Sequence, residues 1–509
     1  MLLKDLARAV DGRLIGDGDI EISSIEHDSR SVTSGALFVA VPGFTVDGHA
    51  YLGRAAENGS PAVVVQEDRK GMWKALVEGA GVDLLVLKNT RRGMAQLAAA
   101  LHGYPARKLN VIGITGTDGK TSLAHLVAHV FTSSGKKAGL ISTAECRIGN
   151  ETLADTGRFT TPESPQVQSM LAQMVAARCD WAVIEATSHG LALHRVDECE
   201  YDIATFTNLG VDHIDFHGGE DEYRASKGRL FQMLDESIDK GVPKTAVLNA
   251  DDQAFDYMQS LTAAKVATYG IDRPADFHAT GLQPDGQGTR FRASTPRATA
   301  EVFMPMPGRF NVYNALAALA IGSAAKLPLD AVTRAIASWP GAPGRTEFIS
   351  QGQPFTVLVD FAHAPDSLRR VLRMLRESVH GRVIAAFGCI GERDKVRRPG
   401  MARVAAELAD YTFITDDNPY TEDRDAILTD IASEMRAVGK RDGHDFSVVP
   451  DRREAIAQAL SMAVDEDAVL LAGKGHEREV HLKDSVYECD DREVARRVLR
   501  EMGYHASAS

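Results

Sequence analysis

Val111-Ile-Gly-Ile-Thr-Gly-Thr-Asp-Gly-Lys-Thr-Ser122 runs from an apolar stretch through a glycine-rich turn into a helical pattern. Glycines allow the backbone to wrap around phosphate oxygens, and the N-terminus of a helix offers unpaired N–H groups. Lys120 adds a positive charge that can reach terminal phosphates, and Thr121 is placed to bind Mg²⁺. We therefore expect a nucleotide-binding loop made of Gly116, Thr117, Asp118, Gly119, Lys120, Thr121 and Ser122.

The glycines of this loop depart from the strict phosphate-loop pattern. That pattern has a glycine five positions before Gly119, where this chain has Ile114, and the glycines here are Gly113 and Gly116. A glycine-rich turn without a ligand is the alternative. It is disfavoured because the strand, Gly-Lys-Thr and the helix coincide in the order that nucleotide binding requires.

The regions around the loop indicate three α/β domains. Apolar runs followed by turns and helices, such as 181–185 and 245–249, are typical of a parallel sheet with crossover helices. Residues 276–302 alternate and are rich in Gly and Thr, which favours a short antiparallel excursion. The first hundred residues read as a small α/β unit, and three later apolar runs indicate a doubly wound α/β domain. Because 509 residues are too many for one core, we expect domains over 1–106, 107–339 and 340–509.

Composition and charge restrict the class of protein. Hydrophobic residues make up 44% of the chain and charged residues 25%, which are values of a folded globular protein without a membrane span. The formal net charge of -13 argues against a general surface for nucleic acid or anionic membrane. Five scattered cysteines predict neither a disulfide framework nor a zinc site, and residues 1–13 lack the apolar core of a secretory signal. We expect a cytoplasmic protein.

The segment Gly113-Ile-Thr-Gly-Thr-Asp-Gly-Lys-Thr121 resembles the nucleotide loop of the Mur ligases and the folylpolyglutamate synthases. Further segments resemble the Mur ligase family, in the expected order, over nearly all 509 residues. The resemblance implies a uridine-nucleotide domain, a central ATPase-type domain and a C-terminal Rossmann-like domain. It implies an ATP-dependent ligase of peptidoglycan synthesis, which adds a diamino acid to UDP-N-acetylmuramoyl-L-alanyl-D-glutamate through an acyl phosphate. Its partners would be small-molecule substrates, and we expect a monomer.

Segments of the first two domains resemble those that hold the UDP-muramoyl dipeptide in this family. Asp28-Ser-Arg30 and the run 35–43 resemble the uridine-nucleotide domain of the diamino-acid-adding members, although Asp-Ser-Arg alone is more typical of a capped turn with a surface ion pair. In a second such segment, Leu193 stands where some relatives have Gln, which puts one polar contact in doubt. The resemblance implies substrate contacts by Ser29, Phe44, Thr45, Val46, Thr160, Thr161, Thr187 and Arg195.

Candidate metal ligands lie in the central domain. Glu185 ends an apolar strand at its carboxyl edge, where ligands gather in parallel sheets, and a buried structural acid is the alternative. The resemblance assigns Thr121, Glu185 and His213 to Mg²⁺. It also matches Lys227 to a lysine that the family carbamylates with CO₂, which makes a further oxygen ligand. From the residues alone, Lys227 reads as a solvated helix lysine, and the polar cluster at 208–217 also fits a hydrogen-bonded turn.

The resemblance implies further ATP contacts across a hinge. Asn311 matches the residue that approaches the adenine, and Arg345 and His363 match C-terminal ATP contacts. A nucleotide held from two domains implies closure, which excludes water from a reactive intermediate. Lys120, Arg345 and Mg²⁺ would stabilise charge on the transferring phosphoryl group. The implied catalytic residues are Lys120, Lys227, His213 and Arg345.

One segment bears on which amino acid is added. Members that add meso-diaminopimelate carry Asp-Asn-Pro-Arg, whereas this chain reads Asp417-Asn-Pro-Tyr420. Tyrosine lacks the charged fork with which arginine clamps a carboxylate, so we expect L-lysine or L-ornithine, with meso-diaminopimelate as the alternative. Arg424 could replace the lost clamp. The amino-acid contacts implied by the resemblance are Arg393, Asp417, Asn418, Tyr420, Gly473 and Glu477.

Two other functions stay open. A folylpolyglutamate-type ligase shares the nucleotide loop, but we would not expect it to carry the Asp-Ser-Arg segment or Asp-Asn-Pro. A nucleotide-binding protein that has lost catalysis is disfavoured because Lys120, Glu185, Lys227 and His213 are all present.

Overall fold

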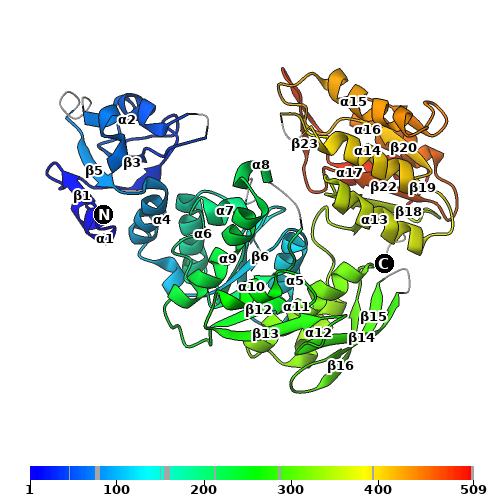
Figure 1. Cartoon of the computed structure of the whole chain (residues 1–509), viewed down its shortest axis with the longest axis horizontal. Helices are drawn as coiled ribbons and strands as arrows, with labels where there is room; N and C mark the ends of the chain where they lie inside the picture. The colour runs from blue at the N-terminus through cyan, green and yellow to red at the C-terminus, as the bar shows by residue number, and fades with distance from the viewer. Residues whose placement is uncertain are drawn as a thin grey trace. The chain divides into compact units, whose positions relative to one another are not determined.

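The computed structural model describes residues 1–44, 46–74, 81–149, 151–153, 161–210, 214–284, 288–392 and 395–505. The chain forms two compact units, which Figure 1 shows together. The first contains Met1–Gly281, Phe291–Val302 and Val312–Ala337, and the second contains Leu282–Arg290, Phe303–Asn311 and the chain from Ser338 onward. Three separate sheets fall within the three predicted domain ranges, whose boundaries at 106/107 and 339/340 we retain as a proposal.

The first sheet has the strand order β1-β5-β4-β3-β2. Strands β2 to β5 pair in parallel, and β1 pairs with β5 in the antiparallel sense. Every residue of β3 is buried, as expected for a parallel strand covered on both faces. The elements are α1 (Leu3–Ala9), β1 (Arg13–Ile15), β2 (Ser24–Glu26), β3 (Ala36–Val39), α2 (Leu52–Glu57), β4 (Ala62–Gln66), β5 (Asp83–Leu87) and α4 (Thr90–Leu101).

The central sheet has the order β16-β15-β14-β13-β12-β11-β6-β10-β7-β8-β9. Strand β6 lies between β10 and β11 and is parallel to both, so the carboxyl ends of these three strands meet at one edge. The predicted excursion at 276–302 corresponds to β14, β15 and β16. The strands are β6 (Asn110–Thr115), β7 (Ala138–Ile141), β8 (Cys146–Ile148), β9 (Glu151–Thr152), β10 (Trp181–Glu185), β11 (Ile203–Phe206), β12 (Thr245–Asn249), β13 (Lys265–Gly270), β14 (Phe277–Pro284), β15 (Thr289–Ser294) and β16 (Thr299–Met304).

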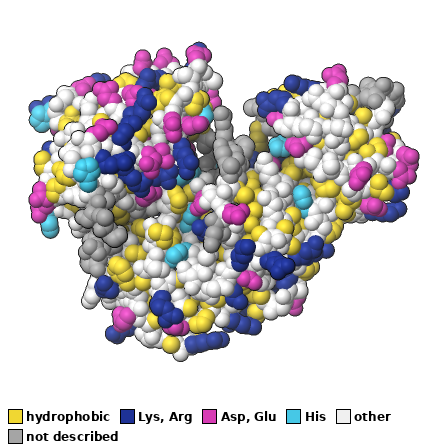
Figure 2. Space-filling model, turned by 180° about the vertical axis from the view of Figure 1, so that it is seen from behind, with side chains coloured by type: hydrophobic (Ala, Val, Ile, Leu, Met, Phe, Trp, Pro, Cys, Tyr) yellow, Lys and Arg dark blue, Asp and Glu magenta, His cyan; other side chains and the backbone are white. Residues whose placement is uncertain are grey.

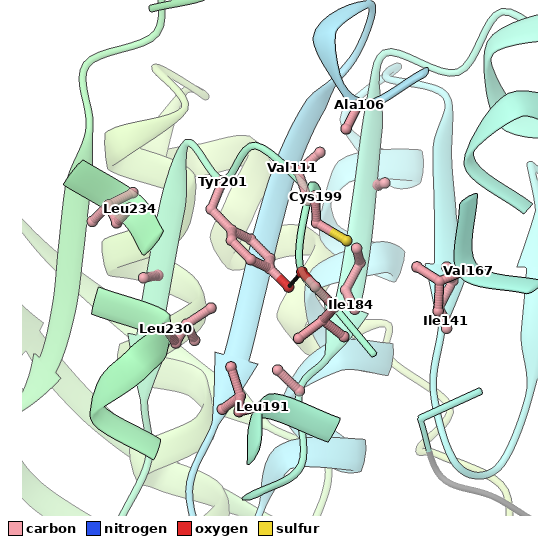
Figure 3. Close-up of a cluster of buried hydrophobic side chains, with 14 of the residues drawn as sticks. Ala106, Val111, Ile141, Val167, Ile184, Leu191, Cys199, Tyr201, Leu230 and Leu234 are labelled. Carbon is pink, nitrogen blue, oxygen red and sulfur yellow. Dashed lines mark hydrogen bonds between the residues drawn. The ribbon is translucent and has the colours of Figure 1, made fainter. Parts of the chain in front are cut away.

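Helix α9 packs on this sheet through an apolar face. Leu230 and Leu234 lie one turn apart on the helix and are fully buried in a core with Val111, Ile184 and Tyr201, which Figure 3 shows. The helices of this region are α5 (Lys120–Ser133), α6 (Ser164–Ala176), α7 (Ser188–Ala192), α8 (Ile214–His217), α9 (Glu220–Glu236), α10 (Phe255–Ser260), α11 (Arg309–Ala324) and α12 (Leu329–Ala337).

The third sheet has the order β17-β18-β22-β19-β20-β21, with all pairs parallel except β17 with β18. Two hydrophobic cores cover its two faces, which confirms the predicted doubly wound arrangement. Its elements are β17 (Glu347–Phe348), β18 (Thr356–Asp360), α13 (Pro365–Ser378), β19 (Val383–Phe387), α14 (Arg397–Leu408), β20 (Tyr411–Ile414), α15 (Arg424–Ala437), β21 (Phe446–Val448), α16 (Arg452–Met462), β22 (Ala468–Ala472) and α17 (Asp491–Glu501), with a separate hairpin of β23 (Glu479–His481) and β24 (Val486–Glu488).

Surface charge is mixed in sign. Figure 2 shows one face of the molecule, on which Lys and Arg side chains lie beside Asp and Glu side chains. Ion pairs such as Arg369–Glu407 and Arg403–Glu434 are part of this pattern. All five cysteines are buried and free. Within the described residues, no helix is both long enough and apolar enough to cross a membrane.

Candidate active site

The predicted strand, turn and helix of the nucleotide loop are confirmed. Strand β6 ends at Thr115, and α5 begins at Lys120 with Gly119 as its N-cap at φ 81°. Gly116 has φ 148°, and a Cβ there would lie 1.9 Å from the hydroxyl of Thr207. Only glycine fits this position, because a side chain would meet both the strained backbone and the neighbouring segment.

Asn208 fixes the conformation of the loop. Its carbonyl oxygen accepts a hydrogen bond from the Thr117 N–H at 2.8 Å, and its side-chain oxygen accepts one from the Asp118 N–H at 3.0 Å. Its amide nitrogen donates to the Asp118 carbonyl at 3.1 Å. These bonds show Asn208 as a support for the nucleotide loop, which accords with the hydrogen-bonded-turn interpretation of this residue.

Glu185 lies at the carboxyl edge of the sheet and is 1% exposed. Its carboxylate accepts hydrogen bonds from the Thr121 hydroxyl at 3.0 Å, the Ser142 hydroxyl at 2.7 Å and the Thr143 N–H at 3.0 Å. The Thr143 hydroxyl also donates to it at 3.0 Å. The carboxylate is therefore buried, held by several donors and in direct contact with the first turn of α5.

Lys227 is 1% exposed, so its interpretation as a solvated helix lysine was wrong. Its Nζ donates to the Gly116 carbonyl at 2.6 Å and lies 4.3 Å from the centre of the Tyr223 ring. Lys120 Nζ donates to the Thr117 carbonyl at 2.7 Å. Two lysines thus donate to backbone carbonyls of the glycine-rich loop.

Oxygen groups suited to a divalent cation lie at the first turn of α5. Mg²⁺ prefers oxygen ligands, and the contact between Thr121 and Glu185 offers a hydroxyl and a carboxylate. Across the described part of the chain, no group of three His, Cys, Asp or Glu side chains could hold a metal ion. The donor set fits Mg²⁺ that keeps several waters. His213 lies outside the described residues.

The residues expected at the muramoyl dipeptide form a connected group. The Thr161 hydroxyl donates to the Glu185 carbonyl at 3.1 Å and lies 2.9 Å from the Thr187 hydroxyl. Arg195 donates to the Thr161 carbonyl at 3.1 Å and pairs with Glu163 at 2.6 Å. This group therefore adjoins the candidate metal site through Glu185. Thr160 lies outside the described residues.

In the first domain, the expected uridine contacts differ in exposure. Ser29 is buried, and the Arg30 guanidinium beside Asp28 lowers the pKa of that carboxyl to about 2, as in the capped-turn interpretation. Phe44 and Val46 are 74% and 50% exposed. The Phe44 ring lies 5.2 Å from the ring of Phe216. Thr45 lies outside the described residues.

In the second unit, the Arg345 guanidinium lies 4.3 Å from the centre of the Phe361 ring. Burial raises the pKa of Asp360, and the positive charge of Arg345 opposes this shift. His363 Nδ1 lies 2.7 Å from the Phe361 carbonyl oxygen. Asn311 is buried and donates to the Pro307 carbonyl at 2.8 Å.

The expected amino-acid site brings together the ends of β20 and β22. The Asn418 amide donates to Glu477 at 2.9 Å, and a Cβ at Gly473 would lie 3.1 Å from the Asp417 carboxylate. Burial raises the pKa of Asp417. Lys474, which was not predicted as a site residue, also lies among these groups. Its place between two glycines at the carboxyl end of a buried strand is the signal that was missed. Arg393 lies outside the described residues.

Tyr420 has a left-handed backbone at φ 53°, and its ring stacks on that of His481 with centroids 5.7 Å apart. Its N–H donates to the His481 carbonyl at 3.0 Å. Arg424, considered above as a replacement clamp, places Nη2 2.7 Å and Nε 3.0 Å from the Asp416 carboxylate. The fork of Arg424 is therefore already engaged by a carboxylate of the chain.

Comparisons with known proteins match the chain to three family descriptions. They are "Mur ligase family, catalytic domain" over 21–102, "Mur ligase middle domain" over 114–322 and "Mur ligase, glutamate ligase domain" over 344–475. A solved structure of a UDP-N-acetylmuramoyl-L-alanyl-D-glutamate–2,6-diaminopimelate ligase is 28% identical with a TM-score of 0.66, and 99% of each chain is covered. The predicted three-domain α/β fold class is confirmed.

Curated relatives are more similar in sequence. A protein of Bacillus velezensis, named as a UDP-N-acetylmuramoyl-L-alanyl-D-glutamate–2,6-diaminopimelate ligase, is 42% identical, and 95% of each chain is covered. A UDP-N-acetylmuramyl-tripeptide synthetase of Roseiflexus sp. is also 42% identical, over 95% of this chain and 96% of the relative. The chain therefore belongs to the Mur ligase family of ATP-dependent, amide-bond-forming ligases.

Proposed function

We propose that this ligase joins a diamino acid to the D-glutamyl side-chain carboxylate of UDP-N-acetylmuramoyl-L-alanyl-D-glutamate, as a step of peptidoglycan precursor synthesis. The observation that carries the proposal is the buried Glu185, whose side-chain carboxylate accepts a hydrogen bond from Thr121 of the nucleotide loop and whose backbone carbonyl accepts one from the Thr161 hydroxyl. This contact connects the expected phosphate site to the expected dipeptide site. The full-length similarity to ligases of this substrate supports it.

The chemistry requires activation of the carboxylate. A carboxylate has a poor leaving group and its charge repels a nucleophile, so it does not condense with an amine at a useful rate. Transfer of the γ-phosphoryl group of ATP to a carboxylate oxygen gives an acyl phosphate and ADP. The neutral amine then attacks the acyl carbon, and phosphate leaves with that oxygen. No protein nucleophile is needed.

The residues present supply positioning and charge. Lys120 would hold the terminal phosphates, and Arg345 would meet charge on the transferring group after domain closure. Thr121 and Glu185 would hold Mg²⁺, which neutralises phosphate charge when it is bound. Thr121 and Glu185 are buried, and exclusion of water at such a site would strengthen their electrostatic contacts.

Lys227 is proposed to carry a carbamate. Its neutral amine would attack CO₂, forming an N–C bond and releasing a proton, and the product is an anion in place of an ammonium. Its burial and its place 2.6 Å from the Gly116 carbonyl support this proposal, because both put Nζ at the nucleotide loop, where a carbamate would supply oxygen ligands to a cation. Crystallographic density at Lys227 from crystals grown with bicarbonate tests it.

For the amino acid, we propose meso-diaminopimelate. The 42% identical Bacillus relative carries 2,6-diaminopimelate in its name, and this favours the alternative over the expected L-lysine or L-ornithine. The expectation from Tyr420 is not confirmed. Tyr420 remains the specific observation in favour of L-lysine or L-ornithine, since it stands after Asp-Asn-Pro where diaminopimelate-adding members have an arginine.

Substrate comparison tests the proposed function. Phosphate release from ATP and Mg²⁺ is measured with a diamino acid and the UDP-muramoyl dipeptide, and separately with L-glutamate and a folate. Release only with the UDP-muramoyl dipeptide is expected. Release only with folate would favour the folylpolyglutamate alternative, and no release with either would favour a binding protein without catalysis.

The place of action is part of the proposal. Five free, buried cysteines suit a reducing compartment, so we propose the cytoplasm. We also propose a monomer, for which light scattering should give a mass near 55.0 kDa.

A further inference from the structure

Lys474 lies in the turn that follows strand β22. Its side chain is 0% exposed, although lysines are rarely fully buried. The turn is closed by a hydrogen bond from the Glu477 N–H to the Lys474 carbonyl at 2.9 Å. The lysine therefore points inward from a loop that the resemblance assigns to the amino-acid site.

The ammonium of Lys474 is one corner of a closed group of hydrogen bonds. It donates to Glu477 Oε2 at 2.7 Å and to Asn418 Oδ1 at 3.1 Å. Asn418 Nδ2 donates to the same Glu477 oxygen at 2.9 Å. Each of the three side chains thus contacts the other two, and none can turn without breaking two bonds.

The carboxylates near Lys474 show whether it does more than neutralise the charge of Asp417. A buried ammonium is unfavourable unless it is paired, and the Asp417 carboxylate lies 4.0 Å away. Neutralisation of Asp417 alone would need no direct bond to Glu477. The Glu477 side chain is 32% exposed, so the short bond from Lys474 holds a carboxylate that reaches solvent.

Asn418, the third member of this hydrogen-bonded group, is also held by backbone groups. Asn418 Oδ1 accepts a second hydrogen bond from the His481 N–H at 3.0 Å, and the Asn418 carbonyl accepts one from the Gly391 N–H at 2.9 Å. Asn418 is consequently bonded to β23 and to Gly391. Lys474 connects these segments to Glu477.

We propose that Lys474 is a positioning residue, which holds Glu477 and Asn418 in the orientation that receives the amine and carboxylate of the incoming amino acid. The inference rests on the proposed function, because it takes the amino-acid site from that proposal. Lys474 itself contacts protein groups, and it acts on the substrate through Glu477 and Asn418.

Lys474→Met tests this role, since methionine keeps much of the length and apolar character of the side chain but has no ammonium. Lys483→Met is the matched control, because Lys483 lies in the nearby hairpin and is exposed. We expect Lys474→Met to raise KM for the amino acid about tenfold or more, while KM for ATP and for the UDP-muramoyl dipeptide changes less than about twofold. The control should match the wild type.

A double variant separates positioning from general stability. If Lys474 acts through Glu477, Lys474→Met should add little to the KM increase already caused by Glu477→Gln. If the two substitutions raised KM for the amino acid independently, their fold-changes would multiply in the double variant, and this would overturn the proposal. An unchanged KM for the amino acid in Lys474→Met would also overturn it. If Lys474→Met does not fold, Glu477→Gln decides alone. An unchanged KM for the amino acid in that variant would refute the inference.

The first half-reaction separates failure of this inference from failure of the proposed function. Hydroxylamine traps an acyl phosphate as a hydroxamate without any diamino acid. A wild-type protein that gives neither hydroxamate nor ligated product would contradict the proposed function. A wild-type protein that gives both, with Lys474→Met showing an unchanged KM, would contradict only the role of Lys474.

Discussion

Glu185→Gln should lower kcat strongly while leaving the free energy of unfolding nearly unchanged. The Glu185 carboxylate is 1% exposed, and three of its hydrogen bonds, from Ser142 and Thr143, reach the same oxygen, Oε2. A glutamine carbonyl oxygen at that position keeps all three bonds. The glutamine NH₂ then faces the Thr121 hydroxyl, which can rotate to accept. Only the negative charge is lost.

The two expected magnitudes differ widely. Neutral hydrogen bonds replace charge-assisted ones while a buried charge is removed, so the free energy of unfolding should change by only about 1 kcal/mol. Loss of a group that stabilises charge during phosphoryl transfer should lower kcat about 10²–10³-fold. By contrast, Glu185→Leu would leave several buried donors unsatisfied and should destabilise by about 3–5 kcal/mol.

The assay is ATP- and substrate-dependent phosphate release over a range of Mg²⁺ concentrations, together with urea unfolding. Glu151→Gln, on an exposed strand residue, is the matched control. If Glu185→Gln kept the wild-type kcat and Mg²⁺ dependence, Glu185 would be a structural acid, and the assignment of the metal site would be refuted.

Three further predictions concern modification, specificity and pH. Lys227→Met should lower kcat at least about tenfold and abolish stimulation by bicarbonate, measured by phosphate release in CO₂-depleted buffer; an equal bicarbonate response in variant and wild type would contradict the carbamate. Tyr420→Arg should lower KM for meso-diaminopimelate relative to L-lysine at least about tenfold, because a guanidinium can clamp the distal carboxylate; an unchanged ratio would remove this position from specificity. The hydrogen bond from Arg398 lowers the pKa of Glu422 from 4.5 to about 2. The ion pair should therefore stabilise the folded protein fully above pH 4.5, and this stabilisation should be lost as the pH falls toward about 2. Urea unfolding of Glu422→Gln and wild type across this range should show a difference that shrinks with acid, and a constant difference would contradict the assignment.

Local patterns predicted the nucleotide loop well. The apolar run before Gly116 and the Gly-Lys-Thr after it specify a strand, a turn and a helix within a few residues, and the structure has all three. The apolar runs 181–185 and 245–249 also predicted strands β10 and β12, because parallel strands buried on both faces read as continuous apolar runs.

Long-range burial was harder to predict. Lys227 is buried because it lies three residues before Leu230 and seven before Leu234, on the apolar face of α9. That spacing was present in the sequence, but a lysine on such a face usually extends to solvent. Lys474 was missed because its partner Asn418 lies 56 residues away in the chain. Such a group forms only when two strand ends meet at one sheet edge.

Transfer of an isotope label tests most directly whether this ligase activates the D-glutamyl carboxylate as an acyl phosphate. The UDP-muramoyl dipeptide is prepared with ¹⁸O in both oxygens of the D-glutamyl side-chain carboxylate and is incubated with ATP, Mg²⁺ and meso-diaminopimelate. Activation as an acyl phosphate predicts one ¹⁸O in each phosphate released and one ¹⁸O in the new amide of the product. Unlabelled phosphate, or phosphate release without a ligated product, would contradict the account.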